Sequence, residues 1–404
     1  MKLASFEILV IEIPLRVAVK HALAEHRVAR NVLVAAHDGE GHIGWGESCP
    51  RTYVTGENVV GARELLRSRI LPDLVGTEAD SFEAVTRRMQ TALEGVKRDQ
   101  QAAFCAAELA VLDLAGHVFG VSAGEVFGPV RRQRSRYSGV IAAGDQESLE
   151  HYAAIARDAG AGAVKVKVGA DLDNNLRVLE TARAVLGDEV ELRIDANCAW
   201  DVAGAIAQLE AMAPFRLAGV EQPLPAGDLP GLRELTAAAI VPVVVDESLA
   251  TLNDARRLVD RRACDIFNIR ISKVGGLVNA ARIQRCAQAA GLECQLGAQV
   301  GETGLLSAAG RHFATRVDDV RWCEGSYDGV LLETQVTAPD ITVGPGGWAD
   351  AIAGPGLGVA PLPAALDGAA DRWTEAELRG LVDPDGAPLD EALDACTVQR
   401  IAVG

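Results

Sequence analysis

Residues 163–169 read AVKVKVG, a short run in which valines alternate with Lys165 and Lys167. In a β-strand, successive side chains point to opposite faces, so the two lysines share one face and the valines share the other. If the strand belongs to a closed barrel, one face lines the interior and the other packs beneath helices, where an unpaired lysine would be costly to bury. The run therefore predicts a pair of lysines pointing into a barrel. The alternative is a solvated edge strand with two surface lysines.

Three carboxylates follow, each at the end of a hydrophobic run: Asp195 in RIDAN, Glu221 in VEQP and Asp246 in VVVDES. They are 26 and 25 residues apart, about the length of one strand, one helix and two short loops in a β/α barrel. A single acidic residue at a strand end is usually a helix N-cap. Three at this period return to the same rim of the barrel, where carboxylate oxygens suit Mg²⁺, with Mn²⁺ as an alternative.

Short β-rich runs continue at this rhythm from about residue 131 to residue 343, with amphipathic helical stretches between most of them. We count eight runs: 137–142, 163–168, 191–195, 219–221, 241–246, 265–271, 293–296 and 319–324. Eight β/α repeats favour a parallel barrel over an open doubly wound sheet. We therefore predict a modified TIM-type (β/α)8 barrel over residues 131–343.

The flanking parts of the chain have a different pattern. Three predicted strands, 6–14, 31–37 and 43–47, precede helical patterns at 58–70, 81–93 and 100–116, which predicts an α+β capping domain over residues 1–130. We expect its first strand to be an edge strand. The tail, residues 344–404, is rich in Gly and Pro, and we expect it to pack back on the capping domain.

Composition excludes several classes of function. A net charge of −17 argues against nucleic acid as a partner, because phosphate binding needs a basic surface. Eight cysteines without CxxC spacing argue against structural zinc and disulfides, and favour free thiols in a reducing compartment. The longest apolar run, Ala237–Val245, is too short to span a bilayer. We expect a cytoplasmic protein with no membrane partner, and the lack of a GxGxxG or Walker A motif gives no support to a nucleotide cofactor.

Five motifs, in order along nearly the whole chain, resemble the enolase superfamily in its muconate-lactonizing-enzyme subgroup, the mandelate racemase/muconate lactonizing enzyme family. They are KVKVG at 165–169, RIDAN at 193–197, EQP at 221–223, DES at 246–248 and KVGG at 273–276. The resemblance implies that Asp195, Glu221 and Asp246 bind Mg²⁺. It also implies that Lys167 removes the α-proton of a small carboxylate substrate, and that Lys165 favours the neutral amine of Lys167 by like-charge proximity. The cation would stabilise the enediolate that forms.

The sequence departs from this family at the sixth barrel strand. The family usually has a lysine there, on the opposite face of the substrate, 24 residues after the last metal-binding aspartate; this chain has Arg270. Arginine stays protonated and cannot act as a base, although it can hold a carboxylate with two hydrogen bonds. Lys273 lies nearby at the following turn, with the opposite strand parity. It is either a surface loop lysine or a substituted catalytic residue, and we include both Arg270 and Lys273 among the catalytic candidates.

Other candidates surround these positions. Asn197, Gln222 and Glu247, next to the three carboxylates in sequence, are expected to support them. Loops of the cap would cover the substrate with His21 and Tyr53, although either loop could be an ordinary surface loop. The last two barrel strands bring Gln299, Glu302 and Glu324 to the mouth, where acidic groups would suit a cationic part of the substrate. A hydrogen-bonded scaffold role is the alternative for Glu324.

The predicted function is α-proton abstraction from a small carboxylate by an Mg²⁺-dependent isomerase or lyase. With one base available, we expect cycloisomerisation or β-elimination, as in muconate cycloisomerases or dehydratases. One alternative is an epimerase or racemase of an amino acid, a dipeptide or a betaine. Another is a catalytically silent metal-binding paralogue. A Schiff-base aldolase using Lys167 or Lys273 is disfavoured, because the three carboxylates would have no cation. Because the family is commonly oligomeric, we expect a homo-oligomer.

Overall fold

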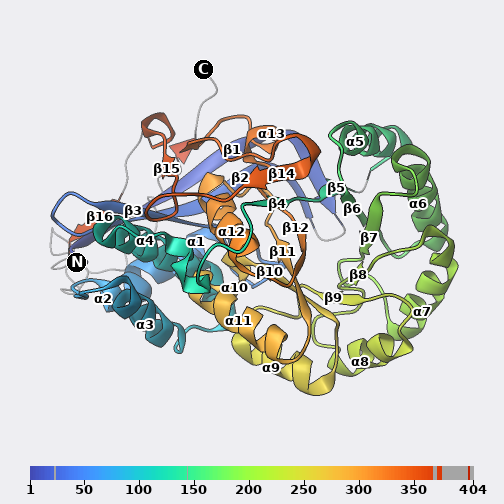
Figure 1. The fold of residues 1–404 in the computed structure, drawn as a ribbon, viewed down its shortest axis with the longest axis horizontal. Coiled ribbons are helices and arrows are strands. Elements are labelled where there is room, and N and C mark those ends of the chain that lie inside the picture. The colour runs from blue at the N-terminus through green and yellow to red at the C-terminus, as the bar shows by residue number, and fades with distance from the viewer. Residues whose placement is uncertain (22–23, 143, 367–370, 375–398, 401–404) are drawn as a thin grey trace.

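The computed structural model describes residues 1–21, 24–142, 144–366, 371–374 and 399–400. Its central element is a curled sheet of eight parallel strands, and an antiparallel sheet with its own helices lies beside it (Figure 1). The expected combination of a modified β/α barrel with an α+β capping domain is confirmed. The boundaries that we placed after residues 130 and 343 stay a prediction.

The barrel strands follow one another in chain order around the curled sheet. They are β5 (Gly139–Ile141), β6 (Ala163–Lys167), β7 (Glu191–Asp195), β8 (Val220–Glu221), β9 (Val243–Val245), β10 (Ile266–Arg270), β11 (Glu293–Gly297) and β12 (Val320–Cys323). The first and last strands meet through a parallel bridge between Tyr137 and Cys323, where the Ser138 N–H donates to the Cys323 carbonyl at 2.8 Å. The predicted eight strands are thus all present in the predicted order.

Helices cover the outside of this sheet, and Figure 1 shows α5 to α9 as an arc around the strands. The barrel helices are α5 (Gln146–Asp158), α6 (Leu172–Leu186), α7 (Val202–Ala211), α8 (Leu229–Ala238), α9 (Leu252–Arg261), α10 (Ile271–Val274), α11 (Leu277–Ala289), α12 (Gly304–Arg316) and α13 (Asp328–Leu331). The helices α5 to α9 each begin after an Asp or Thr whose side chain accepts a backbone N–H of the first turn. This capping fixes where each helix starts.

The capping domain begins with three antiparallel strands, and its helices follow them in the chain. They are β1 (Ser5–His21), β2 (Ala24–His37) and β3 (Ile43–Ser48), followed by α1 (Val59–Leu65), a π-helical turn (Leu66–Ile70), α2 (Leu71–Leu74), α3 (Phe82–Leu93) and α4 (Gln101–Phe119). The prediction that the first strand lies at an edge is wrong. The tail strands β16 (Asp371–Thr374) and β17 (Gln399–Arg400) pair with the side of β1 that β2 leaves free. The tail therefore returns to the cap as expected.

Two further short strand pairings involve residues 337–361, which follow the last barrel strand. β4 (Arg134–Arg136) pairs with β14 (Trp348–Asp350), and β13 (Thr337–Ala338) pairs with β15 (Ala360–Pro361). The first ladder joins the later chain to residues just before the first barrel strand, and the second joins two segments of the later chain to each other. The seven cysteines in the described residues are all free, as expected, whereas Cys396 lies outside the described residues.

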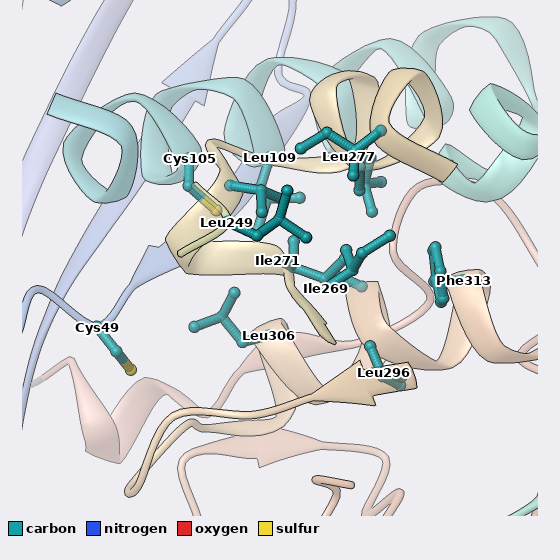
Figure 2. Packing of buried hydrophobic residues seen from close by; sticks show 14 of the residues in the cluster. Cys49, Cys105, Leu109, Leu249, Ile269, Ile271, Leu277, Leu296, Leu306 and Phe313 are labelled. Atoms are coloured by element: carbon teal, nitrogen blue, oxygen red, sulfur yellow. The ribbon is translucent and has the colours of Figure 1, made fainter. Parts of the chain in front are cut away.

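The central helix of the molecule is α4, which packs on β3 of the cap. The segment Arg98–Phe119 is long and apolar enough to cross a membrane, but 83% of its apolar 18-residue window is buried inside the protein, as in a core helix. The approach to β3 is so close that a Cβ at Gly46 would lie 2.0 Å from the Ala106 carbonyl oxygen. Cys105 and Leu109 of α4 point toward Leu249 and Ile271 of the barrel (Figure 2). One hydrophobic core thus joins the two units.

Two carboxylates of the cap also join it to the barrel. Glu108 of α4 accepts the Leu277 and Val278 N–H groups, at 3.1 and 2.7 Å, at the start of α11. Glu47 of β3 accepts N–H groups of Thr303 and Leu306, at 2.9 and 3.0 Å, at the start of α12. A helix N-terminus carries unsatisfied N–H groups and partial positive charge, so a carboxylate there stabilises the helix.

Burial raises the pKa of Glu47 to about 7 and that of Glu108 to about 8, even though the hydrogen bonds that they accept act in the opposite direction. A carboxyl with a raised folded-state pKa binds its proton more tightly in the native protein than in the unfolded chain. Its stabilising contribution is complete below about pH 4.5 and is lost as the pH rises through 7 to 8. We therefore expect each group to lower the free energy of unfolding by about 1.4 kcal/mol per pH unit above pH 5, up to about pH 7 for Glu47 and about pH 8 for Glu108.

Urea unfolding at pH 5, 6, 7 and 8 would measure this dependence in the wild type and in the Glu47→Gln and Glu108→Gln variants. In each amide variant, the free energy of unfolding should fall less steeply with pH, because the contribution of the replaced carboxyl is missing. Parallel pH profiles in all three proteins would show that these carboxyls ionise normally.

Candidate active site

The predicted lysines and carboxylates meet at the carboxyl end of the parallel strands. Lys167 pairs in register with Asp195 on the next strand, and Asp195 pairs with Glu221 on the strand after that. Asp246 directly follows β9, and all three carboxylates are completely buried. The helices after these strands are capped by other residues, Asp201, Asp228 and Thr251. The N-cap explanation of the three carboxylates is therefore wrong.

Lys165 points into the barrel, so its placement on a solvated edge strand is also wrong. It is 2% exposed, and its Nζ lies 3.1 Å from both Glu221 oxygens, 2.8 Å from Glu324 Oε2 and 3.6 Å from Asp195 Oδ2. Burial disfavours the ammonium, but these carboxylates outweigh it and raise the pKa of Lys165 above its usual value. Lys165 is thus a fixed positive charge in the floor of the site.

Lys167, two residues further on, is nearer to solvent. Its side chain is 14% exposed, and its Nζ donates to Asp195 Oδ2 at 2.5 Å and to Asn197 Oδ1 at 2.9 Å. Asn197 has a left-handed backbone, with φ of 44°, and donates to Glu247 Oε1 at 3.2 Å. Of the three lysines in the site, Lys167 is the one that a molecule at the barrel mouth can reach.

Glu221 is the most heavily hydrogen-bonded carboxylate of the site. Besides Lys165, it accepts from Asn268 and Gln295, each at 2.9 Å, and contacts Arg270 Nη2 at 3.4 Å. Burial opposes its ionisation, but Lys165 and Arg270 hold the pKa of Glu221 well below its ordinary value. Glu221 is therefore ionised throughout the neutral range.

Arg270 lies between two of the predicted metal ligands. The same nitrogen, Nη2, that contacts Glu221 also donates a short hydrogen bond to Asp246 Oδ2. Its Nη1 donates to Gln299 Oε1 at 3.2 Å. Burial disfavours the guanidinium, but Asp246 and Glu221 keep the pKa of Arg270 above its already high value. Arg270 is thus permanently charged, as expected from the sequence.

Lys273 is completely buried, so its interpretation as a surface loop lysine is wrong. Its Nζ donates to Asp246 Oδ1 at 2.7 Å, to the Asp246 carbonyl at 2.8 Å and to the Asn268 carbonyl at 2.9 Å. An ammonium has three protons, and all three are used here. Lys273 therefore holds Asp246 in place from below, and a role in proton transfer stays only a prediction.

The three predicted supporting residues each contact the strand ends. Gln222 accepts the Asp246 N–H at 2.9 Å and donates to Ser248 Oγ at 2.9 Å. Burial raises the pKa of Glu247 to about 8, with Asp246 as the next cause. One oxygen of Glu247 accepts from Asn197, as described above, and its Oε2 is buried without a hydrogen-bond partner among the described residues.

The predicted substrate contacts divide into two groups. Gln299 reaches Arg270, whereas Glu302 is half-buried and accepts the Gln299 N–H at 2.7 Å, so it supports the loop between β11 and α12. Glu324 accepts from Lys165 and Arg193 in the barrel interior, which matches the scaffold alternative. On the cap side, Tyr53 Oη lies 3.0 Å from His26 Nε2. The side chain of His21 lies outside the described residues.

The loop between β11 and α12 is held by the cap. Asn31 Nδ2 donates to the Gly301 carbonyl and Arg51 Nη2 to the Val300 carbonyl, both at 2.7 Å. Gly301 has φ of 85°, and a Cβ there would lie 2.5 Å from Ala29 Cβ of β2. The close approach of the two backbones requires glycine at this position.

Sequence reasoning missed three buried residues of the site: Asn268, Gln295 and Arg193. The first two donate to Glu221, and Arg193 pairs with Glu324. The two-residue periodicity of a β-strand would have identified Asn268 and Arg193, because each lies two residues before a predicted site residue. Asn268 lies two residues before Arg270 on β10, and Arg193 two residues before Asp195 on β7. Polar residues at alternating positions of a buried strand face the barrel interior.

The donor set is compatible with a divalent cation. Three buried carboxylates on neighbouring strand ends are hard oxygen ligands, and the unpartnered Glu247 Oε2 lies in the same region. Asp195, Glu221 and Asp246 would hold the ion. In the part of the chain that the structure describes, however, no three carboxylate, imidazole or thiol groups converge as metal ligands do. Cationic side chains, Arg270 and Lys165 above all, stand between the carboxylates.

Comparison with known proteins agrees with this architecture. Residues 148–365 match the family described as enolase C-terminal domain-like. A hydrophobic dipeptide epimerase of Citrifermentans bemidjiense is 31% identical over 76% of this chain and 83% of its own length. The dipeptide epimerase of Cytophaga hutchinsonii, in complex with Mg and the dipeptide D-Ala-L-Val, is 25% identical with a TM-score of 0.84, over 93% of this chain and all of that chain. The 2-chloromuconate cycloisomerase of Rhodococcus opacus is 26% identical with a TM-score of 0.83, over 91% of this chain and 98% of its own.

The matched family covers more than half of the chain, and the similar structures extend over both the cap and the barrel. The carboxylates and lysines recognised in the sequence lie together at one end of that barrel. This chain belongs to the enolase superfamily, in its mandelate racemase/muconate lactonizing enzyme family.

Proposed function

We propose that this protein is an Mg²⁺-dependent isomerase that removes and returns the α-proton of a carboxylate derived from an amino acid, such as a dipeptide. The observation that carries the proposal is Lys167, an accessible amine at the barrel mouth beside the buried carboxylates. The similarity to dipeptide epimerases supports this substrate class. It favours epimerisation over the cycloisomerisation or elimination that the sequence suggested.

Each residue of the site has a part in this chemistry. A carbon acid beside a carboxylate is very weak, and a bound Mg²⁺ would supply Lewis-acid stabilisation of the charge that develops. Lys167 would accept the proton at Nζ, positioned by Asn197 and Asp195. Lys165 adds fixed positive charge beneath the reacting carboxylate, and the buried surroundings exclude water.

A second candidate function rests on Arg270. Inversion at carbon normally requires a proton donor on the face opposite the base, and a guanidinium is a very poor one. The lysines other than Lys167 are saturated by carboxylates and carbonyls. One-base cycloisomerisation or β-elimination, in which Lys167 acts alone, is therefore the alternative. The similarity to a chloromuconate cycloisomerase is consistent with it.

The stereochemical course in deuterium oxide separates the two functions. Dipeptides, N-acylated amino acids and unsaturated dicarboxylates would each be incubated, as single enantiomers where chiral, with the enzyme and Mg²⁺. Epimerisation predicts the opposite configuration with deuterium at the α-carbon. One-base chemistry predicts a lactone, an alkene, or deuterium with retained configuration. If no compound of any class exchanged its α-proton, both functions would be wrong and a silent metal-binding paralogue would be favoured.

We further propose that the enzyme works in the cytoplasm as a homo-oligomer. The support for an oligomer is the resemblance to a family whose members are commonly oligomeric. Sedimentation analysis of the purified full chain would test the oligomeric state.

A further inference from the structure

Arg270 occupies the space between two carboxylates that we propose as metal ligands. A single nitrogen, Nη2, contacts both Glu221 Oε1 and Asp246 Oδ2. These two residues lie at the ends of adjacent strands, β8 and β9. A divalent cation held by both carboxylates would compete with the Arg270 guanidinium for these oxygens.

The charges of the site balance without a metal. Hydrogen bonds link five carboxyl groups, Asp195, Glu221, Asp246, Glu247 and Glu324, with five cations, Lys165, Lys167, Arg193, Arg270 and Lys273. Even with every carboxyl ionised, there is no excess negative charge to attract a divalent ion. The proposed ligands become available to Mg²⁺ only if a cation that contacts them directly withdraws.

Arg270 is the cation whose single nitrogen stands between two proposed ligands, whereas Lys167 donates to Asp195 alone among them and Arg193 to none. Lys273 uses all three of its protons, and Lys165 touches three carboxylates. Arg270 Nε, in contrast, is buried and has no hydrogen-bond partner among the described residues, so this pose does not satisfy the guanidinium fully. Its other end already reaches Gln299 in the loop after β11.

The neighbouring strand is shaped to admit the arginine. Gly297 pairs in register with Arg270, and a Cβ at Gly297 would lie 2.2 Å from Asn268 Oδ1 and 2.8 Å from Arg270 Cγ. A larger residue there would push against the arginine stem. Glycine leaves the stem the room that it needs beside β11.

We propose that Arg270 is an exchangeable counter-cation: its guanidinium holds Glu221 and Asp246 together in the metal-free protein, and Mg²⁺ binding displaces it toward Gln299 and the mouth. There its two-pronged donor geometry would hold a substrate carboxylate. This inference rests on the proposed Mg²⁺ function.

Calorimetric titration with Mg²⁺ alone tests the exchange. Arg270→Met removes the competing charge but keeps an unbranched side chain. It should tighten Mg²⁺ binding by about tenfold or more, because no guanidinium has to be displaced from Glu221 and Asp246 before the ion binds. Mg²⁺ should also raise the Tm of Arg270→Met by more than it raises the Tm of the wild type. The matched control is Arg193→Met, which removes an equally buried guanidinium that contacts Glu324 and none of the proposed ligands. Its Mg²⁺ affinity should change by less than about threefold.

If Mg²⁺ affinity rose equally in both variants, any nearby positive charge would weaken Mg²⁺ binding. That result would overturn the proposal that Mg²⁺ displaces Arg270 specifically. Unchanged or weaker binding in Arg270→Met would overturn it too, while leaving the Mg²⁺ function intact. If neither the wild type nor Arg270→Met bound Mg²⁺, both the function and the inference would fall. A second measurement needs no variant. Modification of the wild type by phenylglyoxal, followed by peptide mass spectrometry, should be several-fold faster at Arg270 with Mg²⁺ than with EDTA, and unchanged at Arg193; an unchanged rate at Arg270 would contradict the displacement.

Discussion

Lys167→Ala should lower the rate of α-proton exchange by about a thousandfold or more, because a positioned general base contributes roughly 10²–10⁴-fold to such a step. The other two lysines of the site are fully buried and bound to carboxylates or carbonyls, so neither is placed to substitute. Exchange would be followed by the loss of the α-proton NMR signal in deuterium oxide. Mg²⁺ affinity measured by calorimetry should stay within a few-fold of that of the wild type.

The control for this variant is Lys97→Ala, which removes an exposed lysine of the cap and should leave exchange unchanged. Rescue of Lys167→Ala by a small primary amine would show that the missing group is the amine itself. Exchange that persisted at nearly the wild-type rate would place the base elsewhere. Lys273 would then be the first residue to test.

The second large effect concerns the carboxylates. Asp195→Asn, Glu221→Gln and Asp246→Asn should each weaken Mg²⁺ binding strongly and abolish exchange, because a neutral amide is a poor replacement for an anionic ligand of a hard cation. Glu221→Gln should also be less stable than the wild type. It leaves Lys165 and Arg270 short of an anion inside the protein, and removing one partner of a buried ion pair costs about 3–5 kcal/mol.

Glu324→Gln is the matched control for this series. Glu324 is buried in the same site and contacts Lys165, but it is not a proposed ligand, so its variant should keep Mg²⁺ affinity within a few-fold of the wild-type value. Circular dichroism would verify that each variant is folded. Unchanged Mg²⁺ affinity in all three ligand variants would refute the assignment of the metal site.

The order of the barrel strands and the meeting of Lys165, Lys167, Asp195 and Glu221 could be predicted from the sequence. Both follow from local periodicity: alternation places side chains on one face of a strand, and a repeat of 25 or 26 residues returns each strand end to the same rim. The chemistry of the site could also be anticipated, because it depends on residue type. These features need no knowledge of how distant segments pack.

The errors arose where distant segments decide the outcome. The first strand was wrongly predicted to lie at an edge, because the strands that pair with its free side come from the tail, more than 350 residues away in the sequence. Lys273 looked like a surface residue because its partner, Asp246, lies on another strand. The helix caps supplied by Glu47 and Glu108 come from a different unit of the protein. No pattern in one segment records such partners.

The hydrogen bonds between the cap and the loop after β11 have a consequence for engineering this protein by mutation. Asn31, Glu47 and Arg51 of the cap hold residues 300–303, and the same loop carries Gln299 to Arg270. Substrate choice and proton chemistry are therefore not separate modules. A chimera that takes its cap from a relative would inherit that relative's hold on the loop, and with it a new resting place for Arg270. Directed evolution of this scaffold should accordingly vary both surfaces together, because improvements selected in the cap alone would be transmitted to the barrel as changes in metal occupancy.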